Sequence, residues 1–260
     1  MQQILAVMEQ ISKSQVKLVR SLQQKKFRDE LGLFVAEGEK CVEELRKGFE
    51  LVYRIQSTEY GEQTDSLLAT PTEIEQMSGL RTPQGVIGVF KKKDFPLSTF
   101  NLQLTLVLDG IQDPGNLGTI IRTCDWFGVH TIICSPDTAD CYNPKVVQAT
   151  MGALARVHLV YTDLPEWLEG IKRQESGIKI YGTLLDGKDM YDLLPGIQEC
   201  RNTGIIVMGN EGNGISREVR SFITHPIRIP SYPKNAETSE SLNVAISTAV
   251  VLAEFRRNAQ

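Results

Sequence analysis

The chain has 260 residues, of which 41% are hydrophobic and 23% are charged, and its 28 Lys and Arg against 32 Asp and Glu give a formal charge of −4. This composition is typical of globular proteins and excludes disordered, collagen-like and small disulfide-rich classes. The length allows one large domain or two smaller ones. No apolar run is long enough to span a membrane, and the start has no signal-peptide pattern, so we expect a cytoplasmic protein.

The cysteines and histidines are predicted to be structural. The five cysteines are odd in number, scattered and never spaced as Cys-x-x-Cys, so neither a disulfide framework nor a zinc site is expected. His130, His158 and His225 have no triad or ligand spacing to one another, which disfavours a histidine-dependent hydrolase or a metalloenzyme. We therefore expect no bound metal.

The first 90 residues predict a small α/β domain, because helical and strand patterns of apolar residues alternate along them. Thr72, with Glu75 three residues on, is expected to cap a short helix. The polar segment 91–100, which carries three lysines and a proline, is the predicted linker. The expected order is helix 4–11, helix 14–22, strand 33–36, a helix that ends near Phe49, strand 51–55, helix 72–77 and strand 86–90.

Residues 101–260 change to strands that alternate with helices, which predicts an α/β domain with a mainly parallel sheet covered on both faces. Ligands of such sheets bind beyond the carboxyl ends of the strands, so the loops that leave strands are candidate sites. The expected strands are 104–108, 131–134, 178–182, 204–208 and 227–229, and the expected helices are 117–127, 146–151, 166–173 and 241–257.

Three of these loops carry residues suited to chemistry. The first, residues 108–118, enters a helix that carries Arg122. The second, residues 207–216, is rich in glycine, which lets a ligand approach the backbone, but it fits neither a dinucleotide fingerprint nor a P-loop. The third leads from Ile229 to the last helix. Each has a plain alternative: the second as a simple turn, Arg122 as a solvated side chain, and Asn116, Ser239 or Ser241 as helix caps.

The charges are unevenly distributed, so the mild overall acidity is weak evidence against a nucleic-acid partner. Residues 13–28 hold six basic residues and no acidic one, whereas residues 29–90 hold 12 acidic and five basic residues. Such a stripe is either a solvated helix face or a surface that binds RNA phosphates. We predict RNA binding by Lys25, Lys26 and Arg28, extended by the lysines at 91–93.

Taken together and in this order, the three loops resemble the signature motifs of the SpoU (TrmH) family of RNA ribose 2′-O-methyltransferases, within the SPOUT superfamily. The matching segments are 116–123, 209–215, and Ile229-Pro230 through Ser241-Leu242-Asn243-Val244. The first part of the chain resembles the family's substrate-binding extension, a domain akin to kink-turn-binding ribosomal proteins, at residues 34–38 and 81–86.

The resemblance implies a C-terminal α/β knot (a deep trefoil), a homodimer formed through that domain, and S-adenosylmethionine as the donor of a methyl group to a ribose 2′-hydroxyl. It favours rRNA over tRNA as the substrate and requires no metal. The residues that it places in the reaction site are Asn116, Arg122, Glu211, Ser241 and Asn243, and those that it places against the methyl donor are Gly209, Ile229 and Leu242.

Two points of the mechanism stay open at this level. The family's usual proposal makes Arg122 the general base, but a guanidinium stays protonated, so Arg122 could instead hold the target phosphate by its bidentate fork. Residues 231–238 make the third loop longer than in most relatives, which leaves the donor contacts of Ile229 open. The competing hypotheses are a non-catalytic RNA-binding or ribosome-assembly protein that keeps the fold, and a nucleotide-dependent oxidoreductase.

Overall fold

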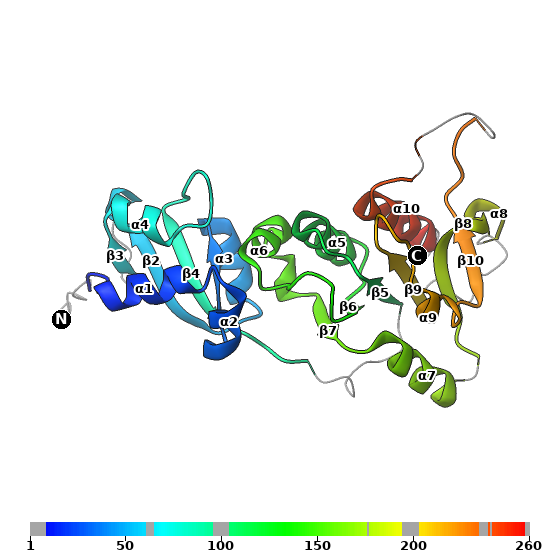
Figure 1. Cartoon of the computed structure of the whole chain (residues 1–260). Helices are drawn as coiled ribbons and strands as arrows, with labels where there is room; N and C mark the ends of the chain where they lie inside the picture. Colours follow the sequence, from blue (N-terminus) through cyan, green and yellow to red (C-terminus); the bar gives the residue numbers. More distant parts are fainter. Residues whose placement is uncertain are drawn as a thin grey trace, which may run out of the picture. The chain divides into compact units, whose positions relative to one another are not determined.

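The computed structural model describes residues 9–60, 65–95, 104–175, 177–193, 203–233, 239 and 241–257 (Figure 1). The chain forms two compact units. The first comprises Met1–Lys93 and Asp140–Ala155, and the second comprises Asp94–Ala139 and Arg156–Gln260. Residues 140–155, expected in the C-terminal domain, thus pack with the amino-terminal residues. Within the described ranges, no helix is long and apolar enough to cross a membrane.

The first unit is built around a sheet in the order β1-β4-β2-β3. Strand β4 is antiparallel to both β1 and β2, and β3 is parallel to β2. Its elements are α1 (Lys13–Ser21), α2 (Lys25–Leu31), β1 (Leu33–Glu37), α3 (Glu39–Arg46), β2 (Leu51–Ser57), the 3₁₀ turn η1 (Thr58–Tyr60), β3 (Leu67–Ala69), α4 (Pro71–Met77), β4 (Val86–Lys91), α6 (Pro144–Thr150) and the 3₁₀ turn η3 (Ala153–Ala155).

Both faces of this sheet are covered. Successive strand residues point to opposite faces, so neighbouring residues of β1 show what packs on each face. Val35 packs in a cluster with residues of α1 and α4. Its neighbour Phe34 contacts the rings of Phe49, Phe90 and Tyr142 instead, with ring centroids 4.8–5.5 Å apart. Tyr142 comes from the returning segment 140–155, which therefore completes the second core of this unit.

The opening of the chain differs from the prediction. Residues 4–8 of the expected first helix lie outside the described residues, and Gln10 forms a β-bridge with Leu68. The basic stretch 13–28 lies on two helices, since α1 ends at Ser21 and α2 begins at Lys25, and only the first of these helices was expected. Strand β3 has only three residues, too few to produce a recognisable alternation.

The cap of α4 also corrects the prediction, because Thr70 rather than Thr72 is the N-cap. The Thr70 hydroxyl accepts from the Glu73 N–H at 3.3 Å, and the Glu73 carboxylate accepts from the Thr70 N–H at 2.8 Å. The same reciprocal motif therefore occurs two residues earlier, with Pro71 at the first helical position.

The second unit is built on a sheet in the order β10-β8-β9-β5-β6-β7, in which every described pairing is parallel. This confirms the predicted α/β class with a parallel sheet. Its elements are β5 (Thr105–Asp109), α5 (Pro114–Trp126), β6 (Thr131–Cys134), β7 (His158–Tyr161), α7 (Leu164–Gln174), β8 (Ile180–Asp189), α8 (Met190–Leu193), β9 (Ile205–Gly209), α9 (Arg217–Arg220), β10 (His225–Arg228) and α10 (Val244–Arg256).

Helices cover both faces of this sheet, as predicted. Ile180 of β8 packs in a cluster with residues of α7 and α9. The next residue, Tyr181, makes an edge-to-face contact with Phe255 of α10, with centroids 4.9 Å apart. Because neighbouring strand residues point to opposite faces, α10 lies across the sheet from α7 and α9. The pattern of apolar residues does not predict the short β7 and α9.

Candidate functional site

The first and second candidate loops leave two neighbouring strands at the same edge of the sheet. Strands β5 and β9 are parallel, and their last residues, Asp109 and Gly209, are register partners. The buried Asp109 carboxylate accepts a hydrogen bond from the Ser216 N–H at 2.7 Å, which ties the end of β5 to the far end of the second loop. The carboxyl edge predicted to hold the site therefore brings these two loops together.

The second loop folds back on itself directly after β9. A Cβ at Gly209 would lie 2.3 Å from the Gly214 carbonyl carbon and 2.4 Å from the Ile215 nitrogen, so only glycine fits there. Asn210 closes the loop, because its Oδ1 accepts from the N–H groups of Gly212 and Asn213. The loop is thus a tight turn between Asn210 and Gly214, compatible with the simple-turn alternative, and Glu211 lies within it.

Three of the predicted reaction-site residues form one hydrogen-bonded chain. Asn116 donates from Nδ2 to Oε1 of Glu211 at 2.5 Å, and Asn243 donates from Nδ2 to Oδ1 of Asn116 at 2.9 Å. Asn116 lies in the first turn of α5, Glu211 in the loop after β9, and Asn243 just before α10. The three loops that the sequence singled out therefore converge on one point. We call this set the Asn–Glu–Asn chain.

The direction of the Asn–Glu–Asn chain is fixed by a helix end. Asn243 is the N-cap of α10, and its Oδ1 accepts from the N–H groups of Ala245 at 3.0 Å and Ile246 at 3.3 Å. Its amide nitrogen must therefore face Asn116. The Asn116 amide oxygen accepts this hydrogen bond, so the Asn116 amide nitrogen faces Glu211 and donates to it. Among the described contacts, Asn116 engages one carboxylate oxygen of Glu211, and Glu211 is exposed.

The capping alternatives are resolved by the same contacts. Asp113, rather than Asn116, caps α5, since its Oδ1 accepts from the Asn116 N–H at 2.7 Å. Asn243, rather than Ser239 or Ser241, caps α10. The interpretation of Asn116 as only a helix cap is therefore wrong, and its side chain is free for the contact with Glu211.

The other predicted site residues lie near these elements without joining the chain. Arg122 is exposed two turns further along α5, and Ser241 is exposed two residues before Asn243. Of the three predicted donor contacts, Gly209 ends β9, Ile229 directly follows β10, and Leu242 is 51% exposed beside Asn243. No described polar contact links Arg122 or Ser241 to the Asn–Glu–Asn chain.

Sequence reasoning missed Asn210 as a residue of the site. Its Nδ2 donates to the Gly110 carbonyl at 2.7 Å, so it ties the second loop to the first. The available signal was its position, directly after a strand that ends in glycine and one residue before Glu211. An asparagine in such a turn commonly bonds to the backbone two residues on, as it does here.

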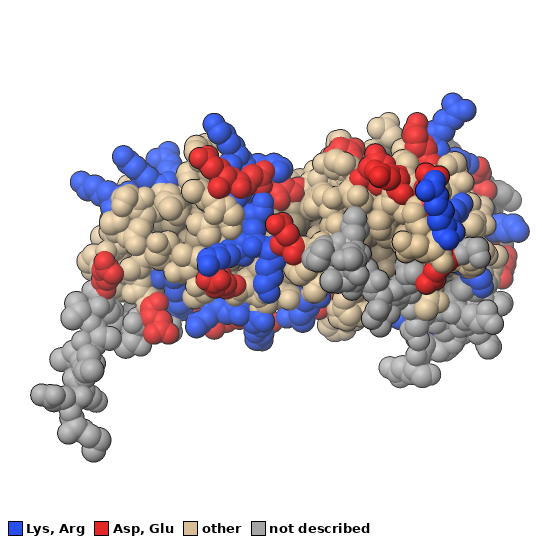
Figure 2. All heavy atoms as spheres, turned by 90° about the horizontal axis from the view of Figure 1, so that it is seen from below, with Lys and Arg blue, Asp and Glu red and all other residues tan. Residues whose placement is uncertain are grey.

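The predicted RNA-contacting residues divide into two groups. Lys25 and Lys26 are exposed on α2, and Lys25 pairs with Asp29 at 2.6 Å. Figure 2 shows that Lys and Arg side chains, with Asp and Glu between them, reach the surface of the molecule. An exposed lysine can contact phosphate, so the prediction for these two residues remains open to test.

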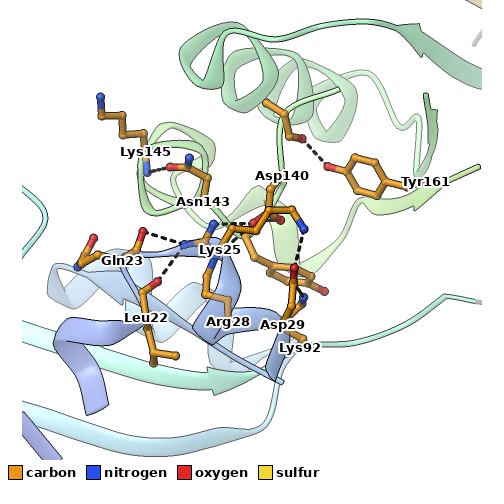
Figure 3. A network of polar contacts seen from close by, with 12 residues as sticks. Leu22, Gln23, Lys25, Arg28, Asp29, Lys92, Asp140, Asn143, Lys145 and Tyr161 are labelled. Atoms are coloured by element: carbon orange, nitrogen blue, oxygen red, sulfur yellow. Dashed lines mark hydrogen bonds and ion pairs between the residues drawn. The ribbon is translucent and has the colours of Figure 1, made fainter. Parts of the chain in front are cut away.

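Arg28 does not fit the predicted RNA-binding stripe, because its side chain is only 2% exposed. Its Nη2 pairs with Asp140 at 2.6 Å, and its Nη1 donates to the carbonyls of Leu22 and Gln23 at 2.9 and 3.0 Å (Figure 3). The guanidinium thus donates to two carbonyls just after α1 and pairs with a carboxylate from the returning segment 140–155. Arg28 lies on α2, after the break that follows α1, and it is the buried residue of that helix.

The cysteines in the described part of the chain lie in its interior. Cys41, Cys124, Cys134 and Cys141 are buried, and Cys200 lies outside the described residues. Burial raises the pKa of the Cys41 thiol to about 11. Among the residues with assigned positions, no cluster of three His, Cys, Asp or Glu side chains could hold a metal ion.

The chain belongs to the SpoU rRNA methylase family, whose model matches residues 103–253, and a model of the MRM3-like substrate-binding domain matches residues 13–88. A 23S rRNA (guanosine(2553)-2′-O)-methyltransferase of Bacillus subtilis is 30% identical and covers 95% of this chain and 98% of its own length.

Two solved structures extend this likeness over nearly the whole chain. A TrmH-family structure from Porphyromonas gingivalis superposes with a TM-score of 0.83, at 37% identity and over 95% of this chain and 98% of that one. An rRNA methyltransferase from Sinorhizobium meliloti with bound AdoMet has a TM-score of 0.81, at 30% identity and over 97% of each chain. These matches confirm the resemblance read from the three motifs and exclude the oxidoreductase hypothesis.

Proposed function

We propose that this protein transfers a methyl group from S-adenosylmethionine to a ribose 2′-hydroxyl of rRNA. The observation that carries the proposal is the Asn–Glu–Asn chain, in which three loops of the family's motifs meet through two hydrogen bonds. The substrate class is supported by the curated relative, which is named for 23S rRNA, and by the match to a substrate-binding domain over residues 13–88.

The residues present fit the methyl donor. Leu242 leaves half of an apolar side chain exposed directly beside Asn243, and Gly209 has no side chain at the point where β9 ends. Ile229, half-buried after β10, would add a second apolar contact. When bound, S-adenosylmethionine supplies a methyl group already activated by the positive charge on its sulfur, so the protein has to align the acceptor and manage its proton.

Glu211 would orient the attacking hydroxyl. One of its carboxylate oxygens accepts a hydrogen bond from Asn116. The other can accept a hydrogen bond from the ribose 2′-hydroxyl and take up the proton of that hydroxyl during methyl transfer. Arg122, exposed on α5, would hold the adjoining phosphate with its fork of donors and stabilise the negative charge that develops on the oxygen. Ser241, exposed at the start of the third motif, would bind the RNA backbone.

The expected homodimer is part of this proposal. Trp126 of α5 is 85% exposed and Ile246 of α10 is 56% exposed, on two helices that pack against each other. Large apolar side chains in this position support burial against a second copy. Arg122 lies one helical turn before Trp126, so a second copy on this face would also border the phosphate site. The trefoil knot and the cytoplasmic location stay proposals that rest on the family and on the sequence.

The test is methyl transfer from labelled S-adenosylmethionine to an unmodified large-subunit rRNA transcript, followed by mapping of ribose methylation. We expect label at one nucleotide, and no label when Asn116 is replaced by alanine. Calorimetric binding of S-adenosylmethionine without transfer to any rRNA would contradict the proposal. RNA binding without donor binding would instead support the non-catalytic alternative.

A further inference from the structure

Two buried hydroxyl groups hold the loop that leads from β5 to Asn116, and the chemistry above does not use them. Ser135 and Thr138 follow β6, and each is 5% exposed. The Ser135 Oγ accepts a hydrogen bond from the Gly110 N–H at 2.8 Å, and the Thr138 Oγ1 accepts from the Ile111 N–H at 3.3 Å. We call these two residues the hydroxyl pair.

The protons of the hydroxyl pair have one consistent arrangement. The Thr138 Oγ1 lies 3.3 Å from the Leu108 carbonyl oxygen, which can only accept, so the Thr138 proton points there. The two hydroxyl oxygens are 3.0 Å apart, and with the Thr138 proton in use, Ser135 is the donor between them. Each hydroxyl then donates once and also accepts a backbone N–H. Removal of either hydroxyl leaves a buried N–H without its acceptor.

The carbonyls of the same two residues are held as well. Asn210 donates to the Gly110 carbonyl at 2.7 Å, and the Ala139 N–H donates to the Ile111 carbonyl at 2.8 Å. Gly110 also has a φ of +73°, a conformation that side-chain-bearing residues rarely adopt. Two residues after Ile111, Asp113 caps α5 by accepting a hydrogen bond from the Asn116 N–H. The hydroxyl pair thus fixes the backbone segment that determines the position of Asn116.

We propose that Ser135 and Thr138 are positioning residues for methyl transfer, which act by locking Gly110 and Ile111 and thereby place Asn116 against Glu211. This proposal rests on the proposed function. A misplacement of about 1 Å at a reacting group costs up to about 100-fold in rate. The hydroxyl pair therefore controls the catalytic rate constant without touching the substrate.

The test compares two substitutions at one position. Thr138→Val keeps the shape and removes the hydroxyl, whereas Thr138→Ser keeps the hydroxyl and removes a methyl group. The measured quantities are kcat and the KM values for S-adenosylmethionine and for the unmodified large-subunit rRNA transcript. We expect Thr138→Val and Ser135→Ala to lower kcat by about tenfold or more with little change in the KM for RNA. Thr138→Ser should stay within about twofold of the wild-type protein.

Thr248→Val is the matched control. Thr248 is fully buried in the same unit, but the one described hydrogen bond of its hydroxyl is a donation to the Val244 carbonyl within α10. This variant makes the same chemical change and should leave kcat unaltered. Hydrogen exchange of residues 108–116 adds a readout that does not need activity, and exchange should be faster in Thr138→Val than in Thr138→Ser.

Three results would overturn the proposal: wild-type kcat and exchange in Thr138→Val, an equal fall of kcat in Thr138→Ser, or an equal fall of kcat in Thr248→Val. A wild-type protein that transfers no methyl group would refute the proposed function itself. The two failures are therefore distinguishable, because the first occurs in an active enzyme and the second in an inactive one.

Discussion

Asn243 caps the last helix with the oxygen of its side-chain amide and holds Asn116 with the nitrogen of the same group. One residue thus couples the start of α10 to the reaction site. Because the backbone of α10 can only donate at this point, the orientation of the Asn243 amide is fixed, and with it the orientation of the Asn116 amide. The Asn–Glu–Asn chain is preorganised by secondary structure.

The first prediction separates the two roles of Asn243. Asn243→Asp keeps an oxygen acceptor for the helix N-terminus, so the melting temperature should be unchanged or slightly raised. The variant then turns a carboxylate oxygen toward the Asn116 oxygen, forcing the Asn116 amide to flip and to face Glu211 with its oxygen. We expect kcat to fall by about 100-fold, measured by methyl transfer to the rRNA transcript.

Asn143→Asp is the control for this substitution. Asn143 caps α6 by accepting from the Lys145 N–H at 3.0 Å, so the same change is made at a helix start that belongs to the other unit. Activity should be normal in this variant. Normal kcat in Asn243→Asp would show that the link to Asn116 has no catalytic role.

The second prediction concerns the charge of Glu211. Glu211→Gln keeps an oxygen that accepts from Asn116 but removes the carboxylate that would take up the hydroxyl proton. We expect kcat to fall by about 100-fold or more while S-adenosylmethionine binds as before, measured by calorimetry. If donor affinity and kcat fell together by the same factor, Glu211 would be a donor-binding residue instead.

The third prediction tests the RNA surface. Replacing both Lys25 and Lys26 by glutamine should weaken RNA binding and leave S-adenosylmethionine binding intact. The slope of log affinity against log salt should decrease by about 0.7–0.9 for each phosphate that the variant no longer neutralises. Fluorescence titration of a labelled rRNA transcript at several salt concentrations measures this slope. An unchanged affinity and slope would show that these lysines are only a solvated helix face.

The fourth prediction is that Arg28 supports stability. Arg28→Met removes the guanidinium that pairs with the Asp140 carboxylate and donates to the Leu22 and Gln23 carbonyls. Breaking a buried ion pair from one side costs about 3–5 kcal/mol, so denaturant unfolding should occur much earlier. Arg54 is equally buried and pairs with Glu39 at 2.5 Å. Arg54→Met therefore makes the same change at a second buried, paired arginine, and its effect on unfolding is the comparison. A fully stable Arg28→Met protein with weakened RNA binding would instead make Arg28 an RNA-binding residue.

The fifth prediction concerns the thiols. Burial raises the pKa of Cys41 to about 11 and raises that of Cys124 further, so both stay protonated at neutral pH. Iodoacetamide at pH 8 should label them slowly in the folded protein and rapidly after denaturation, as measured by peptide mass spectrometry. Equal labelling rates in the two states would contradict the burial of these side chains.

Much of the fold could be predicted because its signals are local. Strand β6 follows from an apolar run, and its predicted bounds, 131–134, are the observed ones. Short elements such as β3 and β7 have too few residues for a periodic pattern. The packing of residues 140–155 with the amino-terminal unit depends on contacts between distant parts of the chain, such as Arg28 with Asp140, and spacing does not encode these.

The residues of the candidate site could be predicted where their signal is local, but the contacts between them could not. The site's three motifs are contiguous segments at the ends of strands or the start of a helix, so the resemblance to the family could name Asn116, Glu211 and Asn243 as candidates. Their hydrogen-bond order could not, because it depends on which residue caps each helix. Ser135 and Thr138 carry no motif, since a hydroxyl that binds a backbone N–H leaves no pattern of spacing.

The most direct test of the central claim is a map of ribose methylation across all rRNA of the source cells. Cells with the intact gene, cells with the gene disrupted and cells carrying only the Asn243→Asp allele are compared. We predict that one rRNA nucleotide is 2′-O-methylated in the first cells and unmethylated or strongly depleted in the other two. The same methylation at every rRNA ribose in all three would contradict the assignment of this protein as an rRNA 2′-O-methyltransferase.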